Sequence, residues 1–180
     1  MNICVFCSGQ EVDEKYREAA EELGKQMGSR GHTLIWGGSN GGLMRTVADA
    51  VQSAGGKIVG ISVEFLREKA REKADEMVYA PDLPERKRLL RERSDAIVVL
   101  PGGTGTLDEI TEVLELKKHG FYEKPIVFLN TDYFYEGLLI QLEKMESEDF
   151  LARPLKELAL FAKTPREVIK RLEQSSSSTK

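Results

Sequence analysis

The segment Ala96-Ile-Val-Val-Leu-Pro-Gly-Gly-Thr-Gly-Thr106 joins an apolar run of strand length to a glycine-rich turn, and helical spacing of apolar residues follows it. The same order occurs earlier in the chain, where the apolar run Thr33–Trp36 leads into Gly37-Gly-Ser-Asn-Gly-Gly42 and a second helical pattern. Strand, turn and helix in this order form the repeating unit of a parallel sheet. The two segments therefore predict an α/β fold.

The alternation of apolar runs and amphipathic stretches extends over the rest of the chain. We expect strands at Ile3–Cys7, Thr33–Trp36, Ile58–Ser62, Ala96–Leu100, Ile126–Leu129 and Ala159–Ala162. Helical spacing covers Asp13–Gly28, Gly42–Ala54, Leu83–Arg93, Thr106–His119 and Tyr135–Met145, and a capping box at Thr164-Pro-Arg-Glu167 opens a last helix. The mostly charged segment Glu64–Glu76 is typical of a solvated helix or lid. We predict a single Rossmann-like domain over residues 1–173, with a doubly wound parallel sheet flanked by helices, and a disordered tail at 174–180.

The composition is that of an ordinary globular protein, with 41% hydrophobic and 31% charged residues among 180. No apolar run approaches the roughly 18 residues of a membrane-spanning helix, so we expect no membrane partner. The 26 basic and 30 acidic side chains give a net charge of −4, which speaks against a nucleic acid bound by bulk charge. Two histidines and two cysteines are too few for the usual zinc site, so we expect no metal, and no other cofactor is indicated.

Two features near the start of the chain bear on redox chemistry and cellular location. Cys4 and Cys7 form a C-x-x-C pair inside a predicted strand, where residues three apart point to opposite faces. We therefore expect buried structural thiols and no redox or metal pair. Met1 leads directly into the first apolar run, without the basic region and cleavage site of a secretory leader, which predicts a cytoplasmic protein.

The glycines concentrate at two predicted strand ends, where a doubly wound sheet binds its ligands. They are Gly37, Gly38, Gly41 and Gly42 in the first run and Gly102, Gly103 and Gly105 in the second. Backbone N–H groups and a helix N-terminus surround a phosphate there without help from lysine or arginine. Two ordinary tight turns explain the same glycines, but their occurrence at one sheet edge favours a nucleotide or sugar-phosphate site. Neither run matches G-x-G-x-x-G or Walker A, so dinucleotide oxidoreductases and ATPases are not expected.

Two carboxylates follow the second glycine run. Thr106-Leu-Asp-Glu109 has the spacing of a capping box, which is the structural explanation of Glu109. Glu109 also lies one turn into the helix whose N-terminus faces the predicted ligand, where a carboxylate reaches a reacting centre. Glu112 follows three residues later and shares nearly the same helix face. Paired carboxylates of this kind cleave glycosidic bonds.

A cluster of cations precedes the strand of the second glycine run. Five of the nine residues from Glu85 to Arg93 are basic, and a solvated helix face is the usual explanation. Because this helix leads directly into the strand at Ala96, we expect Arg86 and Lys87 to turn toward the phosphate loop. Arg91 and Arg93 are expected to stay in solvent.

Three segments together resemble the LONELY GUY (LOG) family of cytokinin-activating phosphoribohydrolases. They are Trp36-Gly-Gly-Ser-Asn-Gly-Gly-Leu-Met44, Glu85-Arg-Lys87 and Pro101-Gly-Gly-Thr-Gly-Thr-Leu-Asp-Glu109, and the similarity runs from Ile3 to about Leu151. The resemblance implies hydrolysis of the N-glycosidic bond of N6-substituted adenosine 5′-monophosphates, which releases the base and ribose 5-phosphate. It also implies a homodimer or a larger homo-oligomer with the active site near the subunit interface.

The resemblance assigns roles to individual residues of this chain. It implies that Arg86 and Glu109 are the catalytic pair and that Glu68 and Lys87 contact substrate. The remaining substrate contacts that it implies lie in the second glycine run, at Gly103, Thr104, Gly105, Thr106, Leu107 and Asp108. Many family members are labelled lysine decarboxylases, but this chain carries no recognisable pyridoxal phosphate signature.

The chain departs from the family pattern at three positions that bear on the base the site accepts. Ser39 stands where the family usually has a third glycine, Arg45 where a glycine is common, and Glu115 where a substrate-binding threonine is frequent. Two other functions also stay open. One is AMP nucleosidase or general nucleotide salvage activity, and the other is a non-catalytic carrier of a nucleotide or of molybdenum cofactor.

Overall fold

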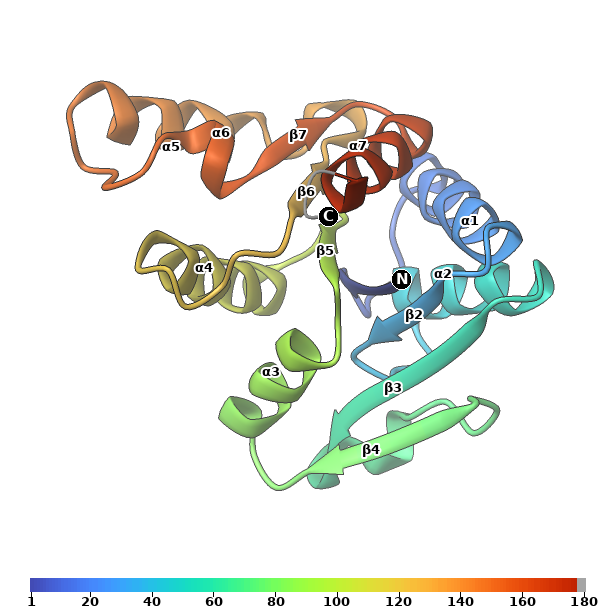
Figure 1. Cartoon of the computed structure of the whole chain (residues 1–180). Helices are drawn as coiled ribbons and strands as arrows, with labels where there is room; N and C mark the ends of the chain where they lie inside the picture. Colours follow the sequence, from blue (N-terminus) through green and yellow to red (C-terminus); the bar gives the residue numbers. More distant parts are fainter. Residues whose placement is uncertain (178–180) are drawn as a thin grey trace.

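Seven parallel strands form one sheet in the order β4-β3-β2-β1-β5-β6-β7 (Figure 1). The computed structural model describes residues 1–177. The strands are β1 Asn2–Phe6, β2 Thr33–Trp36, β3 Lys57–Val63, β4 Glu76–Ala80, β5 Ala96–Val99, β6 Ile126–Leu129 and β7 Leu160–Ala162. The chain winds outward from β1 to β4 and then crosses back to β5, so the switch point of this doubly wound sheet lies between β1 and β5.

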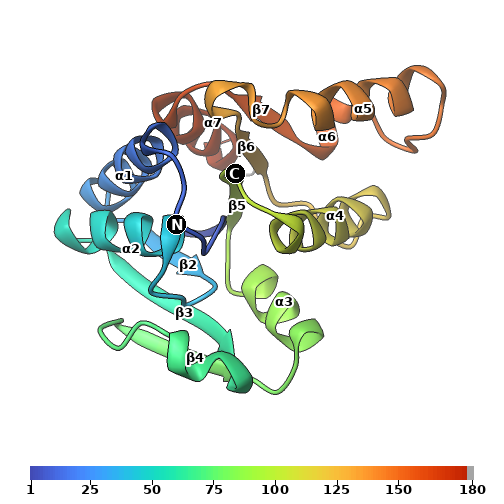
Figure 2. The ribbon, with the colours of Figure 1, turned by 180° about the vertical axis from the view of Figure 1, so that it is seen from behind.

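Helices cover both faces of the sheet (Figure 2). One face carries α1 Glu14–Ser29, α2 Gly42–Ser53 and α7 Pro165–Ser177. The other face carries α3 Leu83–Glu92 and α4 Thr104–Lys118, with α5 Glu136–Ser147 and α6 Leu155–Leu158 beyond α4. Two short 3-10 helices, η1 Glu64–Lys69 and η2 Thr131–Tyr133, complete the described elements. No helix within residues 1–177 is long and apolar enough to cross a membrane.

The strands divide their side chains between two apolar layers, as a sheet buried on both faces requires. Ile3, Val5 and Cys7 belong to the layer that includes the apolar faces of α1, α2 and α7. Cys4 and Phe6 belong to the opposite layer, with side chains of α3 and α4. Both cysteines are buried free thiols on opposite faces, which confirms the interpretation of the C-x-x-C pair.

Most predicted elements are confirmed, and the strand and the α-helix that were missed are β4 and α6, together with the short 3-10 helix η2. We expected a solvated helix or lid over Glu64–Glu76. The structure has the short helix η1 in the first part of this segment, and β4 begins at Glu76. Strand β4 lies at the sheet edge, pairs only with β3 and is mostly half-buried, so its sequence lacks the apolar run of a central strand. α6 is a single turn, too short to produce helical spacing.

The C-terminal helix runs further than we predicted. The Thr164 half of its capping box is confirmed, since Thr164 Oγ1 accepts a hydrogen bond from the Glu167 backbone N–H at 3.2 Å, while the Glu167 carboxylate accepts from the Lys163 N–H at 3.0 Å. α7 then continues to Ser177, so residues 174–177 are helical where we predicted the start of a disordered tail. Ser175 Oγ donates to the Arg171 carbonyl one turn back at 3.0 Å, which is compatible with helix in a serine-rich sequence. The rest of the predicted tail, residues 178–180, lies outside the described residues.

Candidate functional site

The second glycine run forms the start of α4 at the switch point of the sheet. The loops after β1 and β5 meet there, because the Ser8 N–H donates to the Pro101 carbonyl at 3.2 Å. Gly103 is the N-cap residue of α4 and provides no side-chain hydrogen bond to the helix terminus. A Cβ at Gly103 or Gly105 would have no neighbour within 4 Å, so the space beside this helix N-terminus is open to a ligand. The positive helix end and its N–H groups favour an anion at this place.

The capping box at Thr106, the structural explanation of Glu109, is not formed. α4 begins at Thr104, two residues before the predicted start, so Thr106 lies inside the first turn and is buried. A Cβ at Gly102 would lie 2.1 Å from Thr106 Oγ1, which explains why glycine precedes the helix. Glu109 is therefore free of a capping role, and its carboxylate pairs with a side chain of α3 instead.

The first glycine run has a different role, although its sequence looks alike. The N-terminus of α2 is already occupied by a carboxylate, since Glu11 Oε1 accepts from the Gly42 N–H at 3.4 Å and from Arg45 Nη2 at 3.0 Å. Gly41 and Gly42 pack against the loop after β1, where Cβ atoms would lie 2.8 Å and 2.2 Å from backbone oxygens. These two glycines thus allow close backbone packing. Phosphate binding by both runs stays a prediction.

Gly37, at the start of the first run, makes room for a functional side chain. A Cβ at this position would lie 2.4 Å from Nη2 of Arg86, so the guanidinium rests directly on the Gly37 backbone. Gly38 has φ of +77° and packs near Met77 of β4, where a Cβ would lie 2.7 Å from the Met77 methyl group. Both glycines thus contribute to the site through packing.

Arg86 and Glu109 form a buried ion pair between α3 and α4. Arg86 Nη1 lies 2.6 Å from Glu109 Oε1, and the two side chains are 11% and 8% exposed. Arg86 Nε also donates to the Ile61 carbonyl of β3 at 3.0 Å, which fixes the plane of the guanidinium. The structure therefore brings together the two residues that the resemblance pairs, one turn below the open start of α4.

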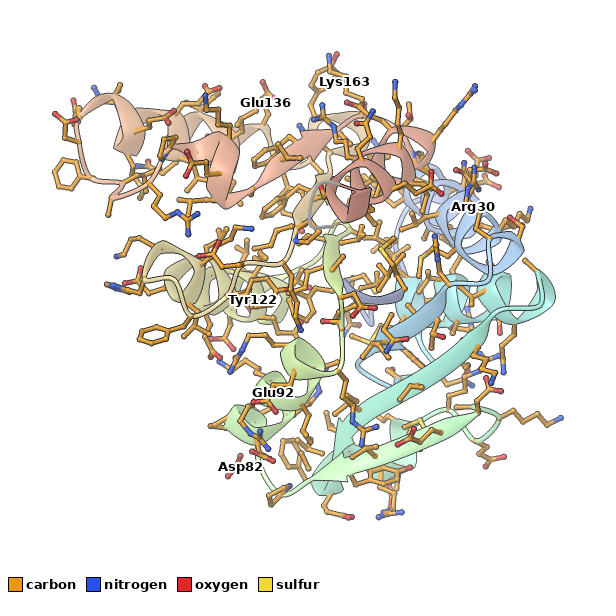
Figure 3. The ribbon with its side chains drawn as sticks, in the orientation of Figure 1. Arg30, Asp82, Glu92, Tyr122, Glu136 and Lys163 are labelled. Carbon is orange, nitrogen blue, oxygen red and sulfur yellow. The ribbon has the colours of Figure 1, made fainter. Side chains whose placement is uncertain are left out.

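The start of α3 is set by Asp82, which Figure 3 shows at one end of this helix with Glu92 at the other. Asp82 Oδ1 accepts from the Glu85 N–H at 2.8 Å and so caps the helix N-terminus. The cap and the proline in the first turn fix where α3 begins. Arg86 is consequently held in the first turns of α3, facing α4.

Burial and charge act in opposite directions on Glu109. Burial raises the pKa of its carboxyl above the usual glutamate value, and the guanidinium of Arg86 partly offsets this rise. Arg86 thus favours the charged form of Glu109 most, and Lys87 adds a smaller effect in the same direction. Carboxyl groups with shifted pKa values cluster at functional sites, so Glu109 is a candidate for a functional group of this site.

The second predicted carboxylate, Glu112, is bound by two cations. Glu112 Oε2 lies 2.6 Å from Lys87 Nζ, and Glu112 Oε1 lies 3.3 Å from Arg91 Nη1. Lys87 also contacts Asp108 at 3.1 Å, and these bonds to Glu112 and Asp108 raise the pKa of its ammonium. Arg91 is therefore half-buried, which corrects our prediction that it stays in solvent. Arg93 remains at the surface, paired with Glu76.

A hollow of the described surface lies beside the first glycine run. It is a cleft of about 980 Å³ between the loop after β1, the first turns of α2 and the segment around η1. Glu68 lines this cleft, together with Ser39 and Arg45, two of the three departures from the family pattern. The third departure, Glu115, pairs with Lys118 at 2.6 Å on the surface of α4.

Two groups in the site have no signal in the sequence. Ile61 acts through its backbone carbonyl, which any residue type supplies. Glu11 lies in a polar loop and accepts from the Gly42 N–H at the start of α2 only because the fold brings the two together. Leu107, which the resemblance includes among the substrate contacts, lies partly exposed in the first turns of α4.

A parallel doubly wound sheet with a glycine-bounded helix N-terminus at its switch point defines an α/β protein with a Rossmann-like fold. Solved structures of other proteins share this fold. A Moco carrier protein from Chlamydomonas reinhardtii matches with a TM-score of 0.76 at 23% identity, over 98% of both chains. At this identity the likeness concerns the fold alone.

Sequence comparison identifies the family within this class. The family model described as "Possible lysine decarboxylase" matches residues 44–172. A cytokinin riboside 5′-monophosphate phosphoribohydrolase of Arabidopsis thaliana is 38% identical over 175 residues, which cover 96% of this chain and 81% of the relative. A protein of the same name from Oryza sativa subsp. japonica is 37% identical over 175 residues, covering 96% and 72%. The chain belongs to the LOG family.

Proposed function

We propose that this protein hydrolyses the N-glycosidic bond of adenosine 5′-monophosphates, with or without an N6 substituent, to the free base and ribose 5-phosphate. The observation that carries the proposal is the buried Arg86–Glu109 pair, at 2.6 Å, beside the open N-terminus of α4. The names of the relatives reported above describe hydrolases of nucleoside monophosphates of this class. Their similarity extends over nearly the whole chain. A substrate with a phosphate and a glycosidic bond fits an anion-binding helix end next to a carboxylate.

The reaction that we propose begins with the phosphate at the N–H groups of Gly103–Thr106, where the dipole of α4 favours a negative charge. The bond between the anomeric carbon and the base breaks, and its electron pair leaves with the base. The ribose becomes an oxocarbenium ion, which Glu109 stabilises electrostatically or captures covalently. Water then forms the new bond to the anomeric carbon, and any bond between that carbon and Glu109 breaks with its electron pair returning to the carboxylate. The proton that the water loses balances the proton that the base takes up.

Arg86 has two roles in this proposal. Its guanidinium favours the charged form of Glu109, which the burial of the site opposes. Positioned by Gly37 and the Ile61 carbonyl, it also orients the sugar and assists the departure of the base. Side chains that are held rigidly beside the substrate lower the activation barrier by orienting the substrate as well as by their charge.

We expect kcat/KM to fall at acidic pH with a midpoint above 4.5, the ordinary glutamate value, because burial raises the pKa of Glu109. Below that midpoint the carboxyl is protonated and carries no charge to stabilise the oxocarbenium ion. A profile of kcat/KM from about pH 4 to about pH 8 reports the free enzyme and measures this midpoint. A midpoint at or below 4.5 would show that Glu109 is not the group whose ionisation controls the reaction.

The 5′-phosphate is expected to be essential for efficient turnover. We expect kcat/KM for adenosine to be lower than for AMP by on the order of a hundredfold or more, because adenosine lacks the charge that α4 binds. Release of free base is measured for AMP, N6-isopentenyl-AMP and adenosine under the same conditions. Equal rates for adenosine and AMP would contradict the placement of the phosphate.

The same measurement separates the alternatives. Preference for N6-isopentenyl-AMP over AMP supports a role in cytokinin activation, and preference for AMP supports nucleotide salvage. Binding of both nucleotides without any release of base supports a carrier protein and overturns the enzymatic proposal.

A homodimer with the site near its interface is part of the proposal. Leu83 and Leu107 are 46% and 37% exposed, and they lie on the first turns of α3 and α4, the helices that carry Arg86 and Glu109. Apolar side chains at these places suit burial against a second copy of the chain.

A further inference from the structure

The charged segment after β3, residues 64–76, is hydrogen-bonded through its middle residues to the first glycine run. Ser39 and Ala70 form an antiparallel β-bridge. The Asn40 N–H donates to the Lys69 carbonyl at 3.0 Å, and the Arg71 N–H donates to the Gly38 carbonyl at 2.8 Å. The composition of this segment indicates a solvated lid, but its backbone is paired with a loop of the site.

One side chain extends this attachment to α2. The guanidinium of Arg71 donates to Asn40 Oδ1 at 3.3 Å and to Gln52 Oε1 at 2.7 Å. It also lies 2.7 Å from Asp49 Oδ1, and its side chain is only 13% exposed. Arg71 therefore joins three elements that the sequence separates: the segment itself, the glycine loop and α2.

One of the elements that Arg71 joins, the glycine loop, also supports Arg86. The Gly37 backbone, at the start of the loop, lies directly against the Arg86 guanidinium. The Ile61 carbonyl, which accepts from Arg86 Nε at 3.0 Å, belongs to β3, the strand that runs into the same charged segment. Gly37 and Ile61 thus both contact Arg86, and both lie in stretches of chain that lead directly into the residues that Arg71 fixes.

We propose that Arg71 is a positioning residue for the catalytic pair: it fixes the Gly37–Gly41 loop against α2 and so maintains the wall that holds the Arg86 guanidinium toward Glu109. Arg71 touches neither of the two catalytic side chains and acts through the loop. The expected effect of Arg71 on activity rests on the proposed function. The claim that Arg71 fixes the loop does not depend on it.

The segment offers a matched control in Arg67. This arginine lies on η1 of the same segment, pairs with Glu64 at 2.8 Å and stacks on the Tyr79 ring at 3.7 Å. Its side chain is 57% exposed, and these contacts keep it on the outer side of the segment. Replacing it removes a guanidinium of equal size and charge from the same stretch of chain.

We expect Arg71→Ala to lower kcat for AMP by between about tenfold and about a hundredfold, the usual cost of a small displacement of a catalytic group. The acidic limb of kcat/KM moves to higher pH, because Arg86 then favours the charged form of Glu109 less well. Arg71→Lys keeps the attraction to Asp49 and restores part of kcat, and Arg67→Ala changes neither quantity. A loss of thermal stability in Arg71→Ala with kcat and the pH profile unchanged would overturn the proposal, since it would show a merely structural role.

A second readout needs no activity. Trp36 is the only tryptophan of the chain, it is buried, and its indole N–H donates to the Ser39 carbonyl of the loop at 3.4 Å. Arg71→Ala is expected to shift the Trp36 emission to longer wavelength under native conditions, and Arg67→Ala is not. If the wild-type protein cleaves no nucleotide, the proposed function fails, while an unchanged emission in Arg71→Ala separately overturns the role of Arg71.

A milder variant covers the case in which Arg71→Ala does not fold. Asn40→Ala removes only the bond between the Arg71 guanidinium and the loop side chain, and leaves the contacts of Arg71 with Asp49 and Gln52 in place. A smaller fall in kcat with the same direction of pH shift supports the proposal. A folded Asn40→Ala variant with wild-type kcat and pH profile contradicts it.

Discussion

Glu109→Gln is expected to lower kcat for release of base by on the order of a thousandfold while AMP still binds. The glutamine keeps the shape of the side chain, and its carbonyl oxygen still accepts a hydrogen bond from Arg86. It lacks the negative charge that stabilises the oxocarbenium ion and the nucleophilic carboxylate that captures it. Single-turnover release of adenine measures the chemical step, and calorimetry measures binding of AMP.

The control for this variant is Glu112→Gln. Glu112 lies one turn further along α4 and pairs with Lys87 and Arg91, away from the Arg86–Glu109 pair. We expect its replacement to affect binding of AMP more than kcat, because it loosens Lys87. Near-normal turnover in Glu109→Gln, or an equal loss of kcat in both variants, contradicts the assignment of Glu109 as the reacting carboxylate.

Arg86→Met is expected to reduce both activity and stability. Removing one partner of a buried ion pair leaves an uncompensated charge, which typically costs about 3–5 kcal/mol in the free energy of unfolding. Without the guanidinium the pKa of Glu109 rises further, so a larger fraction of the protein carries a protonated and inactive carboxyl near neutral pH. We expect kcat to fall by on the order of a hundredfold or more and to recover partly as the pH is raised. Urea denaturation and a pH profile measure the two effects.

The double variant Arg86→Met with Glu109→Gln separates charge from packing. Because the unpaired carboxylate is absent, we expect it to be more stable than Arg86→Met alone. The two effects on stability are then non-additive, as for groups in direct contact. Strict additivity would show that the 2.6 Å pair contributes no coupling, and with it the electrostatic account of the site would fail.

The central fold was predictable because its signals are local. A buried parallel strand is a short apolar run, and the glycine turns after β2 and β5 mark the ends of such runs in sequence. The edge strand β4 was not predictable on these grounds, since a strand with one neighbour needs no continuous apolar run. Its position follows from pairing with β3, which is a property of the folded sheet.

The sequence indicated which residues to consider for the candidate site, but it did not indicate how the fold arranges them. Sequence reasoning singled out Arg86, Lys87 and Glu109, and the structure pairs Arg86 with Glu109. It treated the two glycine runs as equivalent, although Glu11 occupies the helix end of the first run. What a glycine does depends on which atoms face its missing Cβ, and those atoms come from segments distant in sequence. The position of Arg71 is hidden for the same reason, because its partners lie about twenty to thirty residues away.

The most direct test of the proposed reaction is a mass balance on AMP and N6-isopentenyl-AMP incubated separately with the wild-type protein. The account predicts that free base and ribose 5-phosphate appear in equal amounts, and that together they match the nucleotide consumed. Release of a nucleoside and inorganic phosphate, or no consumption of either nucleotide, would contradict it.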